Sequence, residues 1–155
     1  MLKRETPATD HMLNALTAAK EAADRDEVPV GAVIVNSATN EVLAREGNRV
    51  EERKDPTAHA EILAIQQACN VLGSPRLELC DLYVTLEPCP MCATAVSFAR
   101  LRRVYFAAYD QKGGGVDHGP RIFHQPTCHH APEVYGGIKE DIASRILKDF
   151  FQLRR

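Results

Sequence analysis

The stretch Asp81-Leu82-Tyr83-Val84-Thr85-Leu86-Glu87-Pro88-Cys89-Pro90-Met91-Cys92 carries a strand pattern that passes directly into a helix start. Residues 81–86 favour a strand because β-branched and aromatic side chains fit a pleated sheet, and Pro88 ends it because proline has no N–H for the ladder. Pro90 suits the first turn of a helix, where an N–H would have no partner. Apolar side chains continue that helix as far as Phe98. The stretch therefore predicts a strand followed at once by a helix.

Two further units are predicted before this stretch. The apolar, β-branched run over residues 28–35 predicts a buried strand. Turn-forming residues 36–40 and a second predicted strand over residues 41–44 complete a hairpin. Asp55-Pro56-Thr57 then predicts the start of a helix that ends near Gly73.

The outer segments complete the pattern. From the capping residues Thr9-Asp10, apolar side chains at helical spacing predict a helix to about Glu27. Residues 103–109 predict another strand, followed by a glycine-initiated loop of about 25 residues, and residues 138–153 predict a closing amphipathic helix. Because helices cross between strands, we expect an α/β fold whose sheet has parallel portions and is covered on both faces. We expect one domain over residues 1–155.

The composition is that of an ordinary soluble protein. The chain has 155 residues, of which 45% are hydrophobic and 26% are charged. No apolar run approaches the roughly 20 residues of a membrane helix, and no apolar segment follows the N-terminal charges as in a secretory signal. The net charge of −2 argues against nucleic-acid binding through a generally basic surface. Any such contact must come from local patches.

The cysteines indicate a reducing compartment. An odd number of them, in a chain without an export signal, favours free thiols and therefore the cytoplasm over a disulfide framework. Only Cys89 and Cys92 are closely spaced, and at a helix start they point to the same side, where the helix dipole stabilises thiolates that can share a metal ion. Cys69 falls on an apolar helix face and is expected in the core. The five cysteines are Cys69, Cys80, Cys89, Cys92 and Cys128.

A second motif, His59-Ala60-Glu61, lies at the start of the preceding predicted helix. Both motifs fall at strand-to-helix junctions, so the fold can bring them together at one rim of the sheet. His59, Cys89 and Cys92 then supply three protein ligands to Zn²⁺, the number typical of a catalytic site with an open fourth position. Glu61 is close enough to lie over that position, where a water molecule binds.

The charge of this ligand set indicates why Glu61 is needed. Two thiolates cancel the charge of Zn²⁺, so a bound water is acidified less than by three neutral histidines. Glu61 can take the proton from that water, place it on a ring nitrogen of the substrate and later protonate departing ammonia. The two motifs together therefore predict hydrolytic deamination of an amino-bearing ring.

Other interpretations of the same residues are weaker. A redox dithiol usually stands after the first strand and has no use for His59 or Glu61. A structural zinc would need a fourth protein ligand, and neither Cys80 nor Cys128 has ligand-like spacing to the pair. The long loop could hold a second metal, although none of its intervals repeats a known site. Its candidate ligands are His118, His124, Cys128, His129 and His130.

With Val28-Pro29-Val30-Gly31-Ala32, Asn48 and the extended stretches around both motifs, the chain resembles the cytidine deaminase superfamily and, within it, the bacterial tRNA-specific adenosine deaminases. The resemblance covers nearly the whole chain. It implies a three-layer α/β/α sandwich around a mixed five-stranded sheet and a homodimer with one Zn²⁺ per chain. It also implies conversion of the wobble adenosine of a tRNA anticodon to inosine.

The resemblance further implies roles for individual residues. His59, Cys89 and Cys92 bind zinc, and Glu61 moves protons. The predicted substrate contacts are Asn48 to the flipped base, Val30 and Leu86 lining its pocket, and Asp110 with the Phe150-to-Arg155 tail, including Phe151, Arg154 and Arg155, against the RNA backbone and neighbouring nucleotides.

One segment departs from the family pattern. Pro126-Thr127-Cys128-His129-His130 replaces an Asn-His pair that many bacterial members carry after the loop proline. Because this loop borders the substrate, a deaminase of a free base or nucleoside of the guanine, cytosine or adenosine type stays open as an alternative. The expected partner is an anticodon stem-loop, with no DNA and no membrane. A non-catalytic zinc or redox protein is a third class, against which Glu61 argues.

Overall fold

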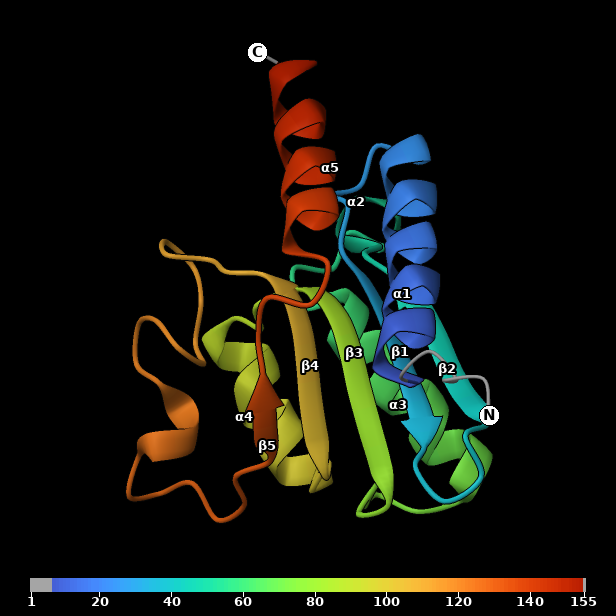
Figure 1. Cartoon of the computed structure of the whole chain (residues 1–155), viewed down its shortest axis with the longest axis vertical. Coiled ribbons are helices and arrows are strands. Elements are labelled where there is room, and N and C mark those ends of the chain that lie inside the picture. The colour runs from blue at the N-terminus through green and yellow to red at the C-terminus, as the bar shows by residue number, and fades with distance from the viewer. Residues whose placement is uncertain (1–6, 155) are drawn as a thin grey trace, which may run out of the picture.

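A computed structural model describes residues 7–154 and places helices on both sides of one sheet (Figure 1). No helix in this range combines the length and apolar character that crossing a membrane requires. The elements in chain order are α1 (Pro7–Asp24), β1 (Gly31–Asn36), β2 (Val42–Gly47), α2 (Val50–Arg53), α3 (Ala60–Leu72), β3 (Cys80–Leu86), α4 (Pro90–Ala99), β4 (Arg103–Ala108), the 3₁₀ turn η1 (Ile122–His124), β5 (Glu133–Tyr135) and α5 (Glu140–Gln152).

The sheet is mixed, with strand order β2-β1-β3-β4-β5. Strand β1 pairs antiparallel with both β2 and β3, whereas β3, β4 and β5 run parallel to one another. A parallel pair needs a crossover connection, which α4 supplies between β3 and β4. This five-stranded sheet with helices on both faces confirms the predicted α/β sandwich.

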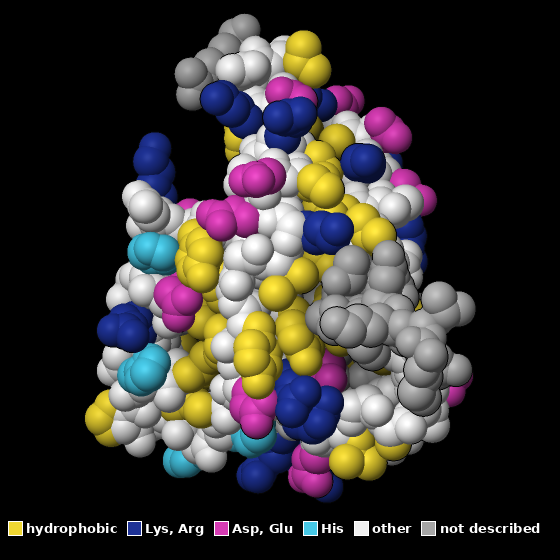
Figure 2. Space-filling view, in the orientation of Figure 1, with side chains coloured by type: hydrophobic (Ala, Val, Ile, Leu, Met, Phe, Trp, Pro, Cys, Tyr) yellow, Lys and Arg dark blue, Asp and Glu magenta, His cyan; other side chains and the backbone are white. Residues whose placement is uncertain are grey.

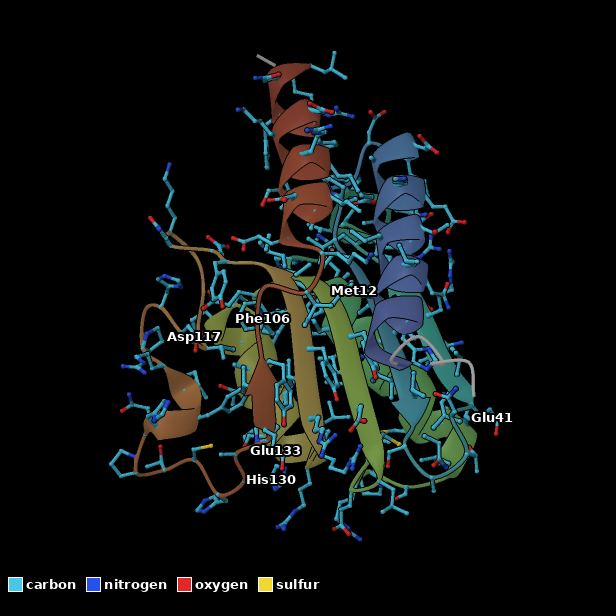
Figure 3. All side chains as sticks on the ribbon, viewed as in Figure 1. Met12, Glu41, Phe106, Asp117, His130 and Glu133 are labelled. Carbon is cyan, nitrogen blue, oxygen red and sulfur yellow. The ribbon has the colours of Figure 1, made fainter. Side chains whose placement is uncertain are left out.

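Each face of the sheet has its own core because side chains alternate along a strand. Ile34 of β1 packs with α3 and α4 on one face, and the adjacent Val33 packs with α1 and α5 on the other. Figure 1 shows α1 and α5 in front of the sheet and α3 and α4 behind it. Met12 and Phe106, labelled in Figure 3, are fully buried in the front and rear cores respectively.

Two predicted element starts are wrong, and local hydrogen bonds explain both. Strand β1 begins at Gly31 and not at Val28, because the Val30 N–H turns back to the Val28 carbonyl at 2.8 Å and leaves the ladder. Helix α3 begins at Ala60 and not at Asp55. The Asp55 carboxylate accepts hydrogen bonds from the Thr57 N–H and hydroxyl, and so forms a turn that precedes the helix.

Other boundaries differ in smaller ways. Helix α1 runs from Pro7 to Asp24, where residues 9 and 27 were the expected limits. The sequence pattern predicts neither the short helix α2 nor the strand β5 within the long loop. Both elements are three or four residues long, too short for any periodicity to show. The predicted strands 41–44 and 103–109, the helix from Pro90 and the stop at Gly73 agree with β2, β4, α4 and the left-handed C-cap of α3 to within a few residues.

Candidate active site

The two predicted motifs lie at the N-termini of α3 and α4. His59 is the N-cap of α3 and Cys89 is the N-cap of α4, both with extended backbone. The Cys92 N–H donates to Cys89 Sγ at 3.5 Å, so the sulfur takes the place of the usual Ser or Asp oxygen at this position. Pro90 follows at the first helical position, as predicted. The positive end of the α4 dipole therefore faces the thiols and favours their thiolate form.

The three predicted ligands are spaced for one metal ion. His59 Nδ1 lies 3.6 Å from Cys89 Sγ and 3.6 Å from Cys92 Sγ, and the three atoms lie within 4.8 Å of one another. Tetrahedral Zn²⁺, with bonds of about 2.0 Å to nitrogen and 2.3 Å to sulfur, holds these two atom types about 3.6 Å apart. The side chains therefore fit Zn²⁺ as they stand. Neither Cys80 nor Cys128 joins this group.

Glu61 lies in the first turn of α3, and only 4% of it is exposed. Burial is the main cause that raises the pKa of its carboxyl to about 7. A carboxyl that titrates near neutrality can both accept and release a proton. The pKa of the Cys89 thiol is lowered to about 4, mainly by hydrogen bonding to Cys92 and further by His59, so this sulfur is ready to bind a cation.

A cavity of about 570 Å³ adjoins the metal group. Helix starts, strand ends and the C-terminal helix all contribute to its wall. The structure brings His59, Glu61 and Cys89 together with five of the predicted substrate residues, which are Val30, Asn48, Leu86, Asp110 and Arg154.

Asn48 is held in one orientation at the cavity wall. Its Oδ1 accepts the Ala60 N–H at 2.8 Å, at the first residue of α3. Its backbone oxygen accepts a hydrogen bond from Arg25 Nη2 at 3.1 Å. Because Oδ1 is engaged by α3, the amide N–H₂ is the end of this side chain that remains for a ligand.

The C-terminal helix forms a further part of the wall. Helix α5 extends past the ends of the strands in Figure 1, and its Phe150 lines the cavity together with Arg154, which follows the helix. Arg154 donates to Asp26 Oδ1 at 2.6 Å, and its guanidinium carbon lies 3.6 Å from the centre of the Phe150 ring. Phe151 points elsewhere, into a neighbouring groove. Arg155, also a predicted contact, lies outside the described residues.

Comparisons with known proteins agree with this geometry. A family model for the cytidine and deoxycytidylate deaminase zinc-binding region matches residues 6–108. The tRNA-specific adenosine deaminase of Agrobacterium fabrum is 56% identical over 147 residues, which span 95% of each chain. That of Aquifex aeolicus is 47% identical over 142 residues, or 91% of each chain. A solved structure from a study of A-to-I editing by tRNA:A34 deaminases at the wobble position of transfer RNA has 57% identity and a TM-score of 0.87, covering 90% of this chain and 99% of that one.

This chain belongs to the tRNA-specific adenosine deaminase family. It is a zinc-dependent deaminase, and His59, Cys89 and Cys92 fit one Zn²⁺ per chain. The family assignment and the ligand geometry exclude the redox interpretation of the cysteine pair, since both thiols belong to the metal group.

In this deaminase a shallow groove continues from the cavity. The groove and the cavity share Val28, Leu86 and Asp110. Tyr109 and Phe151 line the groove beyond them, and they are 41% and 48% exposed. Lys112 also lines the groove. A molecule larger than one base can therefore lie partly in the cavity and partly along the groove.

The histidine side chains of the long loop do not form a cluster. Figure 2 shows histidine side chains dispersed over this part of the surface. Cys128 Sγ lies 3.4 Å from Ser97 Oγ, and His130 Nε2 donates to the Leu101 carbonyl at 2.7 Å. His130 is at the lower end of β5 in Figure 3. Cys128 thus contacts α4 and His130 the connection between α4 and β4, while His129 is exposed. Among the described residues, only His59, Cys89 and Cys92 meet the spacing for a metal, so these loop residues form no second metal group.

Two buried acids of the site were missed in the sequence. Glu27 is 1% exposed, lines the cavity and accepts the Glu51 and Glu52 N–H groups of α2 at 2.9 Å each. Glu87 is 2% exposed and accepts hydrogen bonds from the loop after β4. Burial alone would raise the pKa of Glu87, but hydrogen bonds from His118 and from backbone N–H groups hold it below its ordinary value. For Glu87 the available signal was a lone acid directly before Pro88 in an otherwise apolar stretch, whereas Glu27 follows charged residues and gave no such signal.

Proposed function

We propose that this protein converts the wobble adenosine of a tRNA anticodon stem-loop to inosine, as a single deaminase domain over residues 1–155 that works as a homodimer in the cytoplasm. The observation that carries the proposal is the arrangement of Glu61, which is buried at the wall of a cavity beside the zinc ligands and is not one of them. A carboxyl in that place has a use in deamination and none in a structural zinc site. The family assignment supplies the tRNA adenosine substrate.

The reaction replaces the amino group of adenosine by oxygen from water and releases ammonia. When bound, Zn²⁺ acts as a Lewis acid that makes a water molecule nucleophilic at neutral pH. Glu61 accepts the proton that the water loses and transfers it to the purine ring nitrogen beside the reacting carbon. Glu61 then takes the remaining proton of the water, now on the hydroxyl added to the ring carbon, and passes it to the amino group, which leaves as ammonia. Its nearly neutral pKa suits both transfers.

The other cavity residues hold the base for this step. Asn48 offers its amide N–H₂ to an acceptor on the ring, because its oxygen is bound to the Ala60 N–H. Val30 and Leu86, which line the cavity, provide apolar contacts to a flat ring. A base that is flipped into the cavity is removed from bulk water and held in position for attack by the nucleophilic water.

The groove beside the cavity favours an RNA loop over a free base. A free purine needs only the cavity, whereas a loop also presents neighbouring bases and phosphates. The exposed rings of Tyr109 and Phe151 provide surfaces on which a neighbouring base can stack, and Lys112 and Arg154 provide positive charge near the backbone. Asp110 lies at the junction of cavity and groove.

The homodimer is supported by apolar side chains on the rear layer of the sandwich. On this layer Phe98 of α4 is 75% exposed and Val71 of α3 is 59% exposed, and Leu79, in the connection before β3, is 62% exposed. Large exposed hydrophobic side chains on neighbouring helices are typical of a contact with another chain. Sedimentation of the parent and of Phe98→Glu tests this part of the proposal. We expect a dimer and a monomer respectively, and a monomeric parent would contradict it.

The function is tested by giving the zinc-loaded protein an anticodon stem-loop with adenosine at the wobble position and, in parallel, free guanine, cytosine and adenosine. We expect inosine in the stem-loop and no release of ammonia from the free compounds. Ammonia from guanine or cytosine, with an unchanged stem-loop, would instead establish the small-molecule deaminase.

A further inference from the structure

The carboxylate of Glu87 is buried beside the loop that follows β4, and Glu87 is not one of the residues of the metal group. It lies two residues before Cys89, at the end of β3, where its backbone N–H donates to the Ala108 carbonyl at 2.8 Å. Its side chain has no exposed surface. Placing a carboxylate there costs free energy unless hydrogen bonds compensate for the water it loses. The hydrogen-bond donors to this carboxylate therefore indicate its role.

All five donors to this carboxylate come from one loop segment, residues 110–118. Oε1 accepts the Asp110 N–H at 3.1 Å and His118 Nδ1–H at 2.7 Å. Oε2 accepts three consecutive N–H groups, of Val116, Asp117 and His118, at 3.2, 3.0 and 3.1 Å. Asp117 is labelled in Figure 3, on the loop that follows β4 in the chain. Within residues 7–154 no strand or helix pairs these backbone N–H groups, and Glu87 is the acceptor that satisfies them.

The same loop is fitted closely to the segment that carries the metal ligands. The Gly115 N–H donates to the Pro88 carbonyl at 2.8 Å. A side chain at Gly114 would overlap Glu87 Oε2, and one at Gly115 would meet the backbone nitrogen of Pro90. Residues 87–90 and residues 114–115 are therefore in direct contact, Gly114 with the Glu87 side chain and Gly115 with the backbone of the prolines.

This loop also forms part of the cavity wall. Asp110, whose N–H is held by Glu87, lines the cavity and the groove, and Gly113 lines the cavity. Asp110 Oδ1 in turn accepts the Gly113 N–H at 2.8 Å. The position of this wall relative to Cys89 thus depends largely on the Glu87 carboxylate, together with the Gly115 contact to Pro88, and Glu87 is not a member of the metal group.

We propose that Glu87 is a positioning residue for the substrate, which sets the distance between the Cys89 segment and the Asp110 wall and thereby the affinity for the RNA loop. The inference rests on the proposed function, since the substrate is taken to be the anticodon stem-loop. It assigns to Glu87 an effect on substrate binding, while Glu61 and the zinc ligands, on other elements, retain the chemistry.

The test compares Glu87→Gln with Asp81→Asn. Both changes replace a buried carboxylate by an amide at opposite ends of β3, and Asp81 pairs with Arg102 away from the cavity. Whichever carboxylate oxygen is replaced by the N–H₂ group of Gln, at least two N–H donors of the loop lose their acceptor and face another donor. We expect Glu87→Gln to keep one zinc per chain and to raise KM for the stem-loop about 10-fold with kcat lowered less than 3-fold. Asp81→Asn should lower the melting temperature with KM unchanged.

The split between KM and kcat separates positioning from general destabilisation, because a partly unfolded enzyme loses kcat and keeps its KM. A parental KM in folded Glu87→Gln, or loss of its zinc, would overturn the inference. If Glu87→Gln does not fold, His118→Ala removes only the side-chain donor, and there an unchanged KM would overturn it. A parent enzyme that does not deaminate the stem-loop would refute the proposed function itself, which distinguishes the two failures.

Discussion

The helix starts that carry His59 and Cys89 and the loop over residues 110–118 face the same cavity but are held in place by different means. The first region is fixed by N-caps on two helices that pack against the sheet. The second has no regular structure, and four of its backbone N–H groups donate to the Glu87 side chain. The difference separates chemistry from recognition. Changes at the helix starts should abolish reaction, and changes around the loop and the C-terminal helix should alter affinity.

The largest effect is expected where metal binding and folding coincide. Cys89→Ser and Cys92→Ser each remove a thiolate, so zinc should be largely lost, activity abolished and the melting temperature lowered, because ligand binding stabilises the folded state. Metal analysis and thermal unfolding measure both. Cys69→Ser, at a partly buried thiol of α3 outside the metal group, is the matched control. Full zinc occupancy in both variants would remove the basis for treating the helix starts as the reacting region.

Glu61→Ala tests whether chemistry in that region can be lost without the metal. We expect zinc and melting temperature to be retained, while stem-loop deamination falls by roughly 10²–10⁴-fold or more, because the proton transfers lose their carrier. Glu41→Ala, an exposed acid on the hairpin labelled in Figure 3, is the control and should keep full activity. If Glu61→Ala loses its zinc, the carboxylate supports the metal and the site is structural.

The reacting region could be predicted from the sequence because its geometry is local. A proline at a first helical position and two thiols three residues apart determine which side the ligands face, whatever the rest of the chain does. His59 required one long-range step, the meeting of two helix starts at one end of the sheet. The alternation of side chains along the strands supports that step, because it determines which face of the sheet α3 and α4 cover.

The recognising region could not be predicted in the same way. The loop after β4 has no periodicity, and its conformation follows from hydrogen bonds to Glu87 that span 23 to 31 positions of the chain. The C-terminal tail shows the same limit. Phe150 and Phe151 are neighbours with similar side chains, yet Phe150 lines the cavity and Phe151 the groove, which depends on how α5 crosses the sheet. Composition carries no information on such placements.

Tyr109→Ala tests the groove as a place for a neighbouring base. Stacking of a base on an aromatic ring contributes about 1–3 kcal/mol, so stem-loop affinity should fall about fivefold or more, with zinc content unchanged. Tyr135→Ala is the matched control, because that tyrosine is 43% exposed, compared with 41% for Tyr109, and lies on β5 against Tyr105, outside the groove. Equal affinities in the two variants would show that the groove does not hold RNA.

The smallest expected effect concerns Arg154, because this guanidinium already has a carboxylate partner. Replacing Arg154 and Arg155 by alanine should weaken stem-loop binding and flatten its salt dependence by about one unit or less for each lost phosphate contact. Binding measured from low to high salt gives both quantities. In the free protein Arg154 is paired with Asp26, whose side chain is 87% exposed, so a phosphate must compete with that carboxylate. Asp26→Asn removes the competitor and keeps a residue that tolerates the left-handed backbone at this position (φ 63°), so it should tighten binding slightly. Opposite changes in the two variants would assign the RNA contact to Arg154. Parental binding in the double alanine variant at every salt concentration would instead leave recognition to the cavity and the groove.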